Sequence, residues 1–345
     1  MVLRNAERYL SESIQSILDQ SFEDFEFIII DYGSEDGSKE IVRSYAEKDS
    51  RVKFDEIPAC VLPEARNAGC FRARGRYIAV MDADDISLPD RLSREVDYLE
   101  RHPNVALLGG AIEWITAAGQ PFHISGHPAE NSEIQQELLS HNVFWHPTTI
   151  MRTEAFVAVG GYRPVMVCAH DYDLAVRIAE RFACANLDEV VLRYRVHRFQ
   201  LTSDKQEKQI LCKLATQVSA AARRNGQVDP LNGVREITPT VLSALGVTKK
   251  EQRNAAAIGR YDWVLVLLEA GEHSTALKGV RQIWKSGQNS VTARQISEVY
   301  LQVAAIDWMA RQIWKSLIEI GQAVMVRPIL IGRPLKSLLH KLGVA

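Results

Sequence analysis

The chain has 345 residues, of which 46% are hydrophobic and 24% carry a charge. This composition excludes an intrinsically disordered protein and allows one large or two ordinary domains. The formal net charge of −2 excludes a global electrostatic field that would recruit nucleic acid or an anionic membrane. Five scattered cysteines without CxxC spacing favour a reducing, cytoplasmic environment over a disulfide framework or a zinc site.

The first third of the chain alternates between segments with a helical period and short apolar runs that are typical of buried strands. The expected helices lie at 7–20, around 41–45, at 63–69 and around 92–99, and the expected strands at 25–30, 52–57, 77–81 and 105–109. Strands that alternate with helices of this length predict right-handed crossovers and a mainly parallel sheet. We therefore expect an α/β domain.

Three carboxylates, Asp82, Asp84 and Asp85, follow directly after the apolar run 77–81. The next helix is expected to begin at 87–89, with a proline in its first turn. The carboxylates therefore lie at the carboxyl end of a strand, where open α/β sheets bind their ligands. Such a dense cluster repels itself unless a cation or a hydrogen-bond donor shares the site. Oxygen ligands of this kind suit Mg²⁺ or Mn²⁺.

The pattern loosens into mixed α and β segments after residue 110, and from residue 204 onward it predicts helix after helix. We expect an α/β domain at 1–203 and a helical region at 204–345. The hexapeptide at 281–286 recurs at 311–316, which fits either a helical-hairpin repeat or chance similarity between helices. The basic and apolar stretch 324–344 fits two interpretations: a helix lying on a membrane surface, or one that packs on its own domain.

An ordered series of short motifs resembles the family 2 glycosyltransferases, which have the GT-A fold and transfer sugar with inversion. The matching pieces lie at 5–10, 16–22, 25–34, 65–69, 77–91, 146–148, 160–162, 170–174 and 194–197. The resemblance implies an α/β GT-A nucleotide-sugar-binding domain followed by an all-helical C-terminal extension. It also implies a nucleoside-diphosphate-sugar donor, most often a UDP-sugar, and an Mn²⁺ or Mg²⁺ ion.

Carried over by position, the resemblance assigns roles to individual residues. Asp31 would hold the nucleobase or ribose, Arg66 would lie near the phosphates and Asp82 would contact the ribose. Asp84 would bind the metal that bridges the diphosphate, with Asp85 beside it. The acceptor would be a saccharide or a lipid-linked sugar, in the synthesis of a cell-surface polysaccharide or glycolipid. Nucleic acid is not an expected partner.

Asp171 falls where this family keeps its catalytic base, and a carboxylate that takes the proton of an acceptor hydroxyl accelerates transfer typically 10²–10⁴-fold. A structural interpretation stands beside each assignment. Asp171 could instead cap its helix, and Asp173 could be mistaken for it. Asp31 could be a turn former before Gly33, and Arg66 could lie on a solvated helix face.

Asp85 and Asp90 could both be carboxylates of a first helical turn, which is the preferred interpretation for Asp90. His146 is more simply a structural residue, and His197 could approach the phosphates or the metal. A rival class, the sugar-1-phosphate nucleotidyltransferases, would need a glycine-rich basic loop after the first strand, which the sequence lacks.

Two departures from the family pattern bear on function. Tyr32 stands where the family usually has a second acidic residue, which affects nucleobase recognition. The family also begins with an apolar strand before the helix at 7–20, and only residues 1–4 precede it here. Without that strand we expect weaker folding or donor binding, because each buried Val, Leu or Ile contributes about 1.5–3 kcal/mol. An upstream start codon or a degenerate gene would each explain it. The N-terminal truncation, together with Tyr32, makes a catalytically impaired nucleotide-sugar-binding or protein-interaction module the alternative function.

Overall fold

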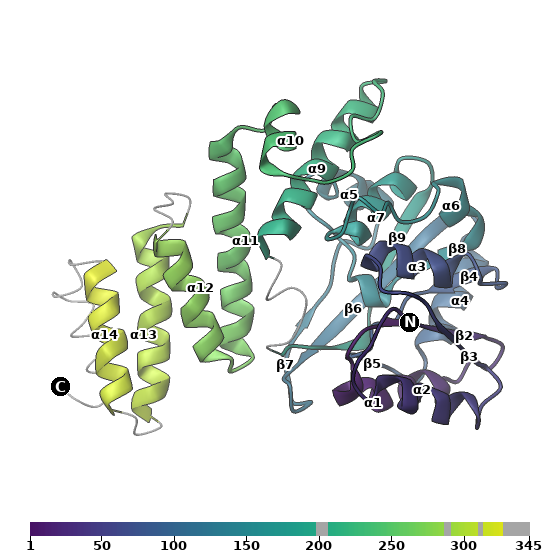
Figure 1. Ribbon diagram of the computed structural model, residues 1–345, viewed down its shortest axis with the longest axis horizontal. Coiled ribbons are helices and arrows are strands. Elements are labelled where there is room, and N and C mark those ends of the chain that lie inside the picture. Colours follow the sequence, from purple (N-terminus) through teal and green to yellow (C-terminus); the bar gives the residue numbers. More distant parts are fainter. Residues whose placement is uncertain (198–205, 286–290, 310–312, 327–345) are drawn as a thin grey trace. The chain divides into compact units, whose positions relative to one another are not determined.

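The computed structural model describes residues 1–197, 206–285, 291–309 and 313–326, and the chain forms two compact units (Figure 1). The first comprises Met1–Val196 and Leu211–Gly246, and the second comprises His197–Ile210 and Val247–Ala345. The boundary expected after residue 203 lies outside the described residues. The segment Leu211–Gly246, expected in the helical region, packs with the first unit.

The first sheet has the strand order β1-β2-β3, with all strands parallel. Its elements are β1 (Val2–Leu3), α1 (Glu7–Leu18), β2 (Phe27–Asp31), α2 (Ser38–Ala46), β3 (Val52–Glu56) and α3 (Leu62–Cys70). The expectation that the first strand is missing is wrong in part, because Val2 pairs with Ile30 and Leu3 with Asp31. Strand β1 is nevertheless only two residues long.

The second sheet has the order β4-β8-β6-β9-β5, and β7 pairs with β6. Its strands are β4 (Tyr77–Ala79), β5 (Ile86–Ser87), β6 (Val105–Ile115), β7 (Pro121–Ser125), β8 (Ile150–Arg152) and β9 (Ala183–Arg195). Only β6 and β9 are parallel, so this sheet is more mixed than the mainly parallel sheet expected. Neighbouring strands are predicted to be parallel only where a crossover helix connects them. After β6 this condition is no longer met, because β7 follows β6 without a helix between them.

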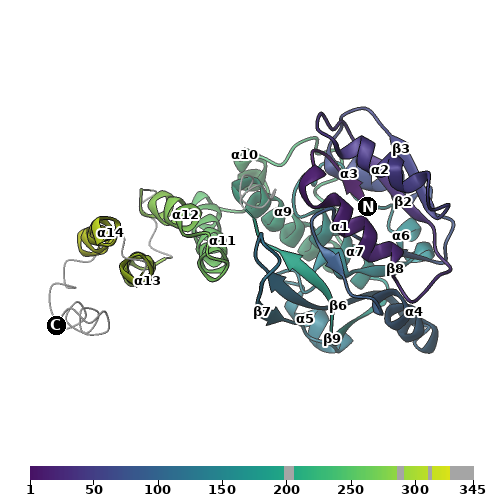
Figure 2. The same cartoon turned by 90° about the horizontal axis from the view of Figure 1, so that it is seen from below.

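The first unit has further helices, most of which contact the second sheet (Figure 2). They are α4 (Arg91–Arg101), α5 (Asn131–Glu137), the 3₁₀ turn η1 (His146–Thr148), α6 (Thr153–Ala158), α7 (His170–Ala179), α9 (Gln206–Arg224) and α10 (Pro239–Ala244). Ala220 of α9 belongs to the same buried cluster as Leu107, Phe156 and Ile178, which is why the segment after Leu211 packs with the first unit. The helix expected at 87–89 begins later, at Arg91, because Ile86 and Ser87 pair with β9.

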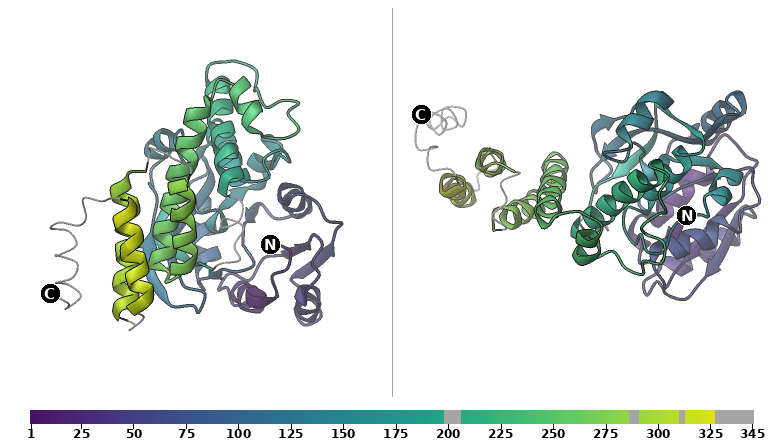
Figure 3. Two further views of the ribbon diagram at one scale, coloured as in Figure 1. Left: turned by 60° about the vertical axis from the view of Figure 1, so that its left-hand side comes forward. Right: turned by 90° about the horizontal axis from the view of Figure 1, so that it is seen from above.

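The second unit is helical, and α11 (Lys249–Glu269) packs with α12 (His273–Lys285) while α13 (Ala293–Met309) packs with α14 (Ile313–Val326) (Figure 3). Thr248 and Glu251 form a capping box at the start of α11. The hexapeptide copies lie at opposite ends of their helices: 281–285 ends α12, and 313–316 begins α14. The tail expected at 324–344 lies outside the described residues from 327 onward. None of the described helices combines the length and apolarity that a membrane span requires.

Candidate active site

The acidic loop, defined here as Asp82–Asp85, follows β4 and is held in place by two distant arginines. Arg91 of α4 donates to the carbonyl of Val80, 2.9 Å away, just before the loop. Arg195, at the end of β9, donates from its backbone N–H to Asp85 Oδ1 (2.8 Å) and from Nε to the carbonyl of Asp84 (2.9 Å). The loop is therefore fixed by the second sheet as well as by the strand it follows.

The carboxylates of the acidic loop differ in their partners. Asp82 pairs with Arg66 (2.7 Å). The Arg195 guanidinium, in contrast, donates hydrogen bonds to the carbonyl of Asp84 and to the carboxylate of Glu12, the latter at 2.5 Å. Asp85 is 1% exposed, and burial together with the charges of Asp84 and Asp82 raises its pKa well above the ordinary value. Among the described residues its Oδ2 has no hydrogen-bond partner. A cation at this position would stabilise the ionised form.

Asp31, at the end of β2, combines both interpretations that the sequence allowed. Its Oδ1 accepts hydrogen bonds from the backbone N–H groups of Gly33 (3.0 Å) and Ser34 (2.9 Å), as a turn former does. Gly33 has φ of +99°, a backbone conformation that favours glycine. The Oδ2 atom of Asp31 is buried and has no partner in the described part of the chain. One oxygen therefore builds the turn, and the other has no hydrogen-bond partner among the described residues.

Arg66 of α3 is 7% exposed, which rules out the solvated helix face considered for it. Burial alone lowers the pKa of Arg66, but the carboxylate of Asp82 raises it above the usual value. One guanidinium nitrogen donates to Asp82, while within the described residues the buried Nε has no acceptor. The side chain can therefore bind a second anionic group.

Asp171 and Asp173 share the first turn of α7 but have different surroundings. Asp173 is fully buried and pairs with Arg163 and Arg177, so its charge is balanced by ion pairs inside the protein. Asp171 is half-buried, and its Oδ2 accepts a single hydrogen bond from Asn142 Nδ2 at 2.9 Å. Burial raises the pKa of Asp171 above its ordinary value. Of the two carboxylates, only Asp171 has the features of a general base.

A cluster of aromatic rings, His146, Tyr162 and His170, lies beside these residues, and the sequence did not identify it as a unit. His146 Nε2 and the Tyr162 hydroxyl are 2.9 Å apart, and the His146 and His170 rings meet edge to face. Burial, followed by the charge of Arg66, holds the pKa of both histidines well below the usual value. Asn67 bonds both the N–H and the carbonyl of Tyr162. The motifs at 65–69, 146–148 and 160–162 could be recognised in the sequence, but nothing in them indicated that their residues would be in contact.

The comparisons with known proteins agree with this geometry. Residues 1–160 match the family model described as Glycosyl transferase family 2. Over 206 residues, 57% of this chain and 78% of the relative, the sequence is 32% identical to the O-antigen biosynthesis glycosyltransferase WbnJ of Escherichia coli. It is 31% identical to an uncharacterized glycosyltransferase of Methanocaldococcus jannaschii over 55% of this chain and 67% of the relative.

The chain belongs to glycosyl transferase family 2. It is a glycosyltransferase, as the motif series predicted. Two solved structures have a similar fold: S. aureus TarS 1-349 in complex with UDP-GlcNAc (TM-score 0.51, 16% identity, 92% of this chain and 87% of that one) and the mannosyltransferase PcManGT of Pyrobaculum calidifontis with GDP-Man and Mn²⁺ (TM-score 0.53, 15% identity, 92% and 85%). The predicted GT-A-like α/β fold with a helical C-terminal region is confirmed.

The acidic loop contains carboxylates of the type that bind divalent ions, but among the described residues they do not form a complete set of metal ligands. In the described ranges no group of three or more His, Cys, Asp and Glu side chains is placed to hold a metal. Mg²⁺ and Mn²⁺ sites that include substrate phosphates need only one or two protein carboxylates. The buried, unpartnered Oδ2 of Asp85 beside Asp84 fits such a site. Tyr32 is 8% exposed and packs against Ile30 and Ala65, so its ring is part of the core.

Proposed function

We propose that this glycosyltransferase moves a sugar from a nucleoside-diphosphate sugar to an acceptor hydroxyl, with inversion and with a divalent cation. The observation that carries the proposal is the uncompensated negative charge at the ends of β2 and β4. Asp31 and Asp85 each keep a buried carboxylate oxygen without a partner among the described residues. Groups buried in this state are costly unless a ligand completes them.

Asp31 is the proposed nucleobase-binding residue. A carboxylate only accepts hydrogen bonds, so its unpartnered oxygen suits a donor on the base, such as the ring N–H of uracil or guanine. TarS and PcManGT are bound to UDP-GlcNAc and to GDP-Man, respectively. A UDP-sugar is the first donor to test and a GDP-sugar the second. Asp82 would contact the ribose, and Arg66 Nε the phosphates.

Asp84, with Asp85, would hold Mn²⁺ or Mg²⁺. A bound ion supplies Lewis-acid stabilisation of the leaving diphosphate, worth several kcal/mol. The protein's own residues position it: the Arg195 hydrogen bonds to Asp84 and Asp85 fix the loop backbone. Arg66, which remains protonated beside Asp82, adds a further positive charge near the diphosphate.

Asp171 is the proposed base that takes the proton from the acceptor hydroxyl. Its raised pKa makes it a stronger base than an exposed carboxylate. Asn142 Nδ2 orients one oxygen and leaves the other for the acceptor. A single base on the face opposite the leaving diphosphate gives inversion in one displacement.

The acceptor is proposed to be a saccharide or a lipid-linked sugar in the synthesis of a cell-surface polysaccharide. WbnJ and the amylovoran biosynthesis glycosyltransferase AmsE of Erwinia amylovora support this class. All five cysteines are free thiols, which supports a reducing compartment. A membrane contact through 324–344 remains part of the proposal and concerns residues outside the described ranges.

The test is the release of nucleoside diphosphate from a panel of UDP- and GDP-sugars, with and without Mn²⁺, in the presence of saccharide acceptors. We expect one base to be preferred and turnover to require the metal. Asp84→Asn should abolish turnover, whereas Asp97→Asn, which changes an exposed carboxylate of α4, should leave it intact. Donor binding without turnover by the folded wild-type protein would instead support the non-catalytic binding module.

A further inference from the structure

Four aromatic rings from separate segments meet on one face of the second sheet. They belong to Trp114 of β6, His127, Trp145 and Tyr194 of β9, and are called the aromatic platform here. Trp114 and Tyr194 are register partners on parallel strands that lie side by side (Figure 1), so their side chains share one face. The centroid of the Trp114 ring lies 5.0 Å from that of Tyr194 and 5.2 Å from that of Trp145, both edge to face.

The aromatic platform is joined to the proposed catalytic groups at two points. Trp145 follows Asn142 by three residues, and Asn142 donates to Asp171 Oδ2 at 2.9 Å. Tyr194 directly precedes Arg195, whose backbone N–H donates to the acidic loop at 2.8 Å. Burial, followed by the charges of the acidic loop and of Asp171, raises the pKa of Tyr194 well above its usual value. The Tyr194 hydroxyl is therefore within electrostatic reach of both the base and the proposed metal ligands.

Trp145 has an unused hydrogen-bond donor. Trp114 Nε1 donates to Ser125 Oγ at 2.8 Å, whereas Trp145 Nε1 is buried and has no partner among the described residues. A buried indole N–H usually finds a partner, and leaving it without one is costly. Trp145, Tyr194 and His127 are also only half-buried, so a ligand can reach them. Accessible rings beside an unsatisfied donor are typical of a binding site.

The aromatic platform itself carries no charge near neutral pH. The His127 and Trp145 ring centroids are 4.7 Å apart, with 32° between the ring planes. Burial, followed by the charge of His141, lowers the pKa of His127 to about 4, so its ring is neutral. The charges that raise the pKa of Tyr194 are all carboxylates, which would repel an acceptor that ends in phosphate.

A neutral sugar satisfies both properties of the platform. The C–H face of a pyranose is apolar and packs against aromatic rings, and its hydroxyl oxygens accept hydrogen bonds. A lipid chain would also cover the rings, but it would leave Trp145 Nε1 without a partner. The platform therefore favours a sugar over a phosphate or a lipid.

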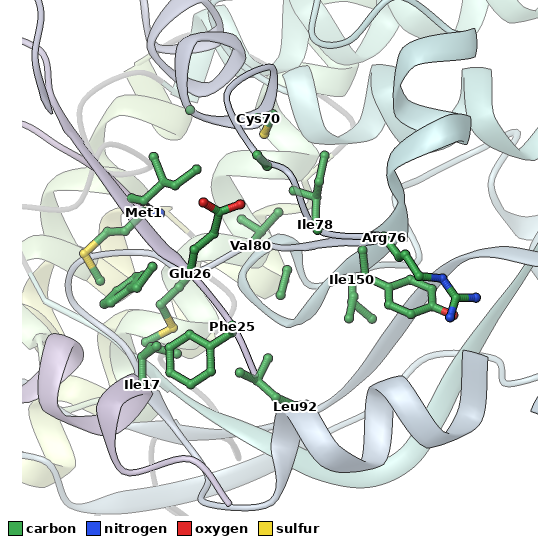
Figure 4. A pocket seen from close by; sticks show the side chains of 18 of the residues that line it. Met1, Ile17, Phe25, Glu26, Cys70, Arg76, Ile78, Val80, Leu92 and Ile150 are labelled. Carbon is green, nitrogen blue, oxygen red and sulfur yellow. Dashed lines mark hydrogen bonds between the residues drawn. The ribbon is translucent and has the colours of Figure 1, made fainter. Parts of the chain in front are cut away.

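A separate cavity of about 840 Å³ lies between β2 and β4, with a mostly apolar lining (Figure 4). Ile17, Val80 and Leu92 are among the described residues that line it, whereas Asp171 and the residues of the aromatic platform are not. A sugar in that cavity would not touch the proposed base. The platform is therefore the better position for the acceptor.

We propose that the aromatic platform is the subsite for the acceptor sugar and that it binds a neutral hexopyranose. The C–H face of the sugar packs against Trp145 and Tyr194, and one of its hydroxyls accepts a hydrogen bond from Trp145 Nε1. This subsite rests on the proposed function, in which Asp171 takes the proton of the acceptor hydroxyl. Trp145 then determines which acceptors bind, and acceptors that end in a neutral sugar are used in preference to those that end in phosphate.

Saturation-transfer NMR on the full chain, with UDP or GDP and Mn²⁺ present, tests this subsite directly. The probes are the methyl glycosides of glucose, galactose, mannose and N-acetylglucosamine, with glycerol 3-phosphate for comparison. We expect at least one glycoside to bind through the C–H protons of one ring face, and glycerol 3-phosphate not to bind. Trp145→Phe keeps a ring but removes the N–H, and should weaken the best glycoside about five- to tenfold.

Trp284→Phe is the matched control, because Trp284 of α12 is 47% exposed and lies in the second unit; it should bind as the wild type does. If Trp145→Phe lowers Tm, His127→Ala removes the ring beside Trp145 instead and should weaken the same glycoside at least about twofold. A folded wild type that binds none of the glycosides, or variants that bind them as tightly as the wild type, would overturn the proposal. So would tighter binding of glycerol 3-phosphate than of any glycoside.

Turnover distinguishes this subsite from the proposed function. If both are correct, Trp145→Phe raises KM for the acceptor sugar about five- to tenfold and leaves kcat and the donor KM near the wild-type values. Sugar transfer with an unchanged acceptor KM would overturn the subsite and leave the function standing. Glycoside binding that depends on Trp145, without release of nucleoside diphosphate, would overturn the function and retain a sugar-binding site.

Discussion

Two regions of the first unit contain several carboxylates and arginines, and they differ in how the carboxylates are paired. In the interior network Asp173 pairs with Arg163 and Arg177, and Asp229 pairs with Arg163 and Arg223. In the acidic loop Asp82 pairs with Arg66, and Asp85 keeps a buried oxygen without a hydrogen-bond partner among the described residues.

The difference separates a stabilising network from a binding site. Each carboxylate in the interior network has its hydrogen-bond acceptors occupied; Ser219 also donates to Asp229 at 2.7 Å. Removing one member leaves a buried charge unpaired and destabilises the fold. In the acidic loop we propose that a ligand supplies the missing partner of Asp85. Substitutions there should therefore affect ligand binding and turnover more than folding.

The largest expected effect is at Asp171. We expect Asp171→Asn to lower kcat by about 10²–10⁴-fold, because the amide cannot take the acceptor's proton. Tm and donor affinity should stay near the wild-type values, since Asp171 belongs to no ion pair among the described residues and accepts a hydrogen bond from the neutral amide of Asn142. Initial rates at saturating donor and acceptor measure kcat. A variant with wild-type kcat would remove Asp171 from the mechanism.

The substitution Asp173→Asn, two residues further along α7, should instead lower the stability of the fold and leave catalysis unchanged. Asp173→Asn leaves Arg177 without its carboxylate partner and Arg163 with Asp229 alone. Breaking a buried ion pair in this way costs about 3–5 kcal/mol of unfolding free energy. Urea denaturation measures the loss. Activity per folded molecule should remain. If stability is unchanged and turnover is lost, the assignment of the two aspartates is reversed.

Asp84→Asn tests the acidic loop itself. In the wild-type protein, a nucleoside diphosphate at a hundred times its Kd should stabilise the fold by about 2.7 kcal/mol when Mn²⁺ is present. The variant should lose the Mn²⁺-dependent part of this gain and keep its own stability. Thermal unfolding with and without Mn²⁺ gives both quantities, and Asp97→Asn is the control. An undiminished metal effect in Asp84→Asn would exclude this carboxylate as a ligand.

The smallest effect concerns Glu95, which pairs with Arg91 at 2.9 Å with both side chains fully buried. Burial raises the pKa of Glu95 from 4.5 to about 7. The native state therefore holds its proton more tightly than the unfolded chain, and this contribution to stability is present below pH 4.5 and declines as the pH rises through 7. Glu95→Gln leaves Arg91 unpaired and should lower stability overall, but it should also remove this decline, so that the difference in unfolding free energy between pH 4.5 and pH 8 shrinks by on the order of 1–3 kcal/mol.

Urea denaturation at pH 4.5 and pH 8 measures the effect of Glu95→Gln. Glu100→Gln, an exposed position paired with Arg76, is the control and should change little at either pH. A variant that keeps the wild-type decline in stability between pH 4.5 and pH 8 would exclude Glu95 as its source.

The sequence predicted the parts of the site that depend on local pattern. Asp31 and the acidic loop follow apolar runs, so their place at strand ends could be inferred from periodicity alone. The start of α4 could not, because β5 is only two residues long and forms through pairing with β9. The choice between Asp171 and Asp173 was equally inaccessible, since both lie in one helical turn and differ only in partners far along the chain, such as Asn142 and Arg163.

The first strand also formed where the local sequence did not predict it. Residues 1–4 contain too few apolar positions to predict a strand, yet Val2 and Leu3 pair with β2 because its edge offers a ready ladder. Arg195, which fixes the acidic loop from far along the chain, lay within a matching motif, but no spacing rule indicated its role. Tertiary pairing decides these cases.

The most direct test of the central claim, that the unmatched carboxylates form a metal-dependent nucleotide-sugar site, is calorimetric titration of the protein with UDP and GDP, with and without Mn²⁺. Our account predicts that one of the two binds and that binding weakens strongly when the metal is removed. Asp173→Asn should keep this metal dependence, whereas Asp84→Asn should lose it. A folded wild-type protein that binds neither nucleotide, or binds equally well without a divalent ion, would contradict the account.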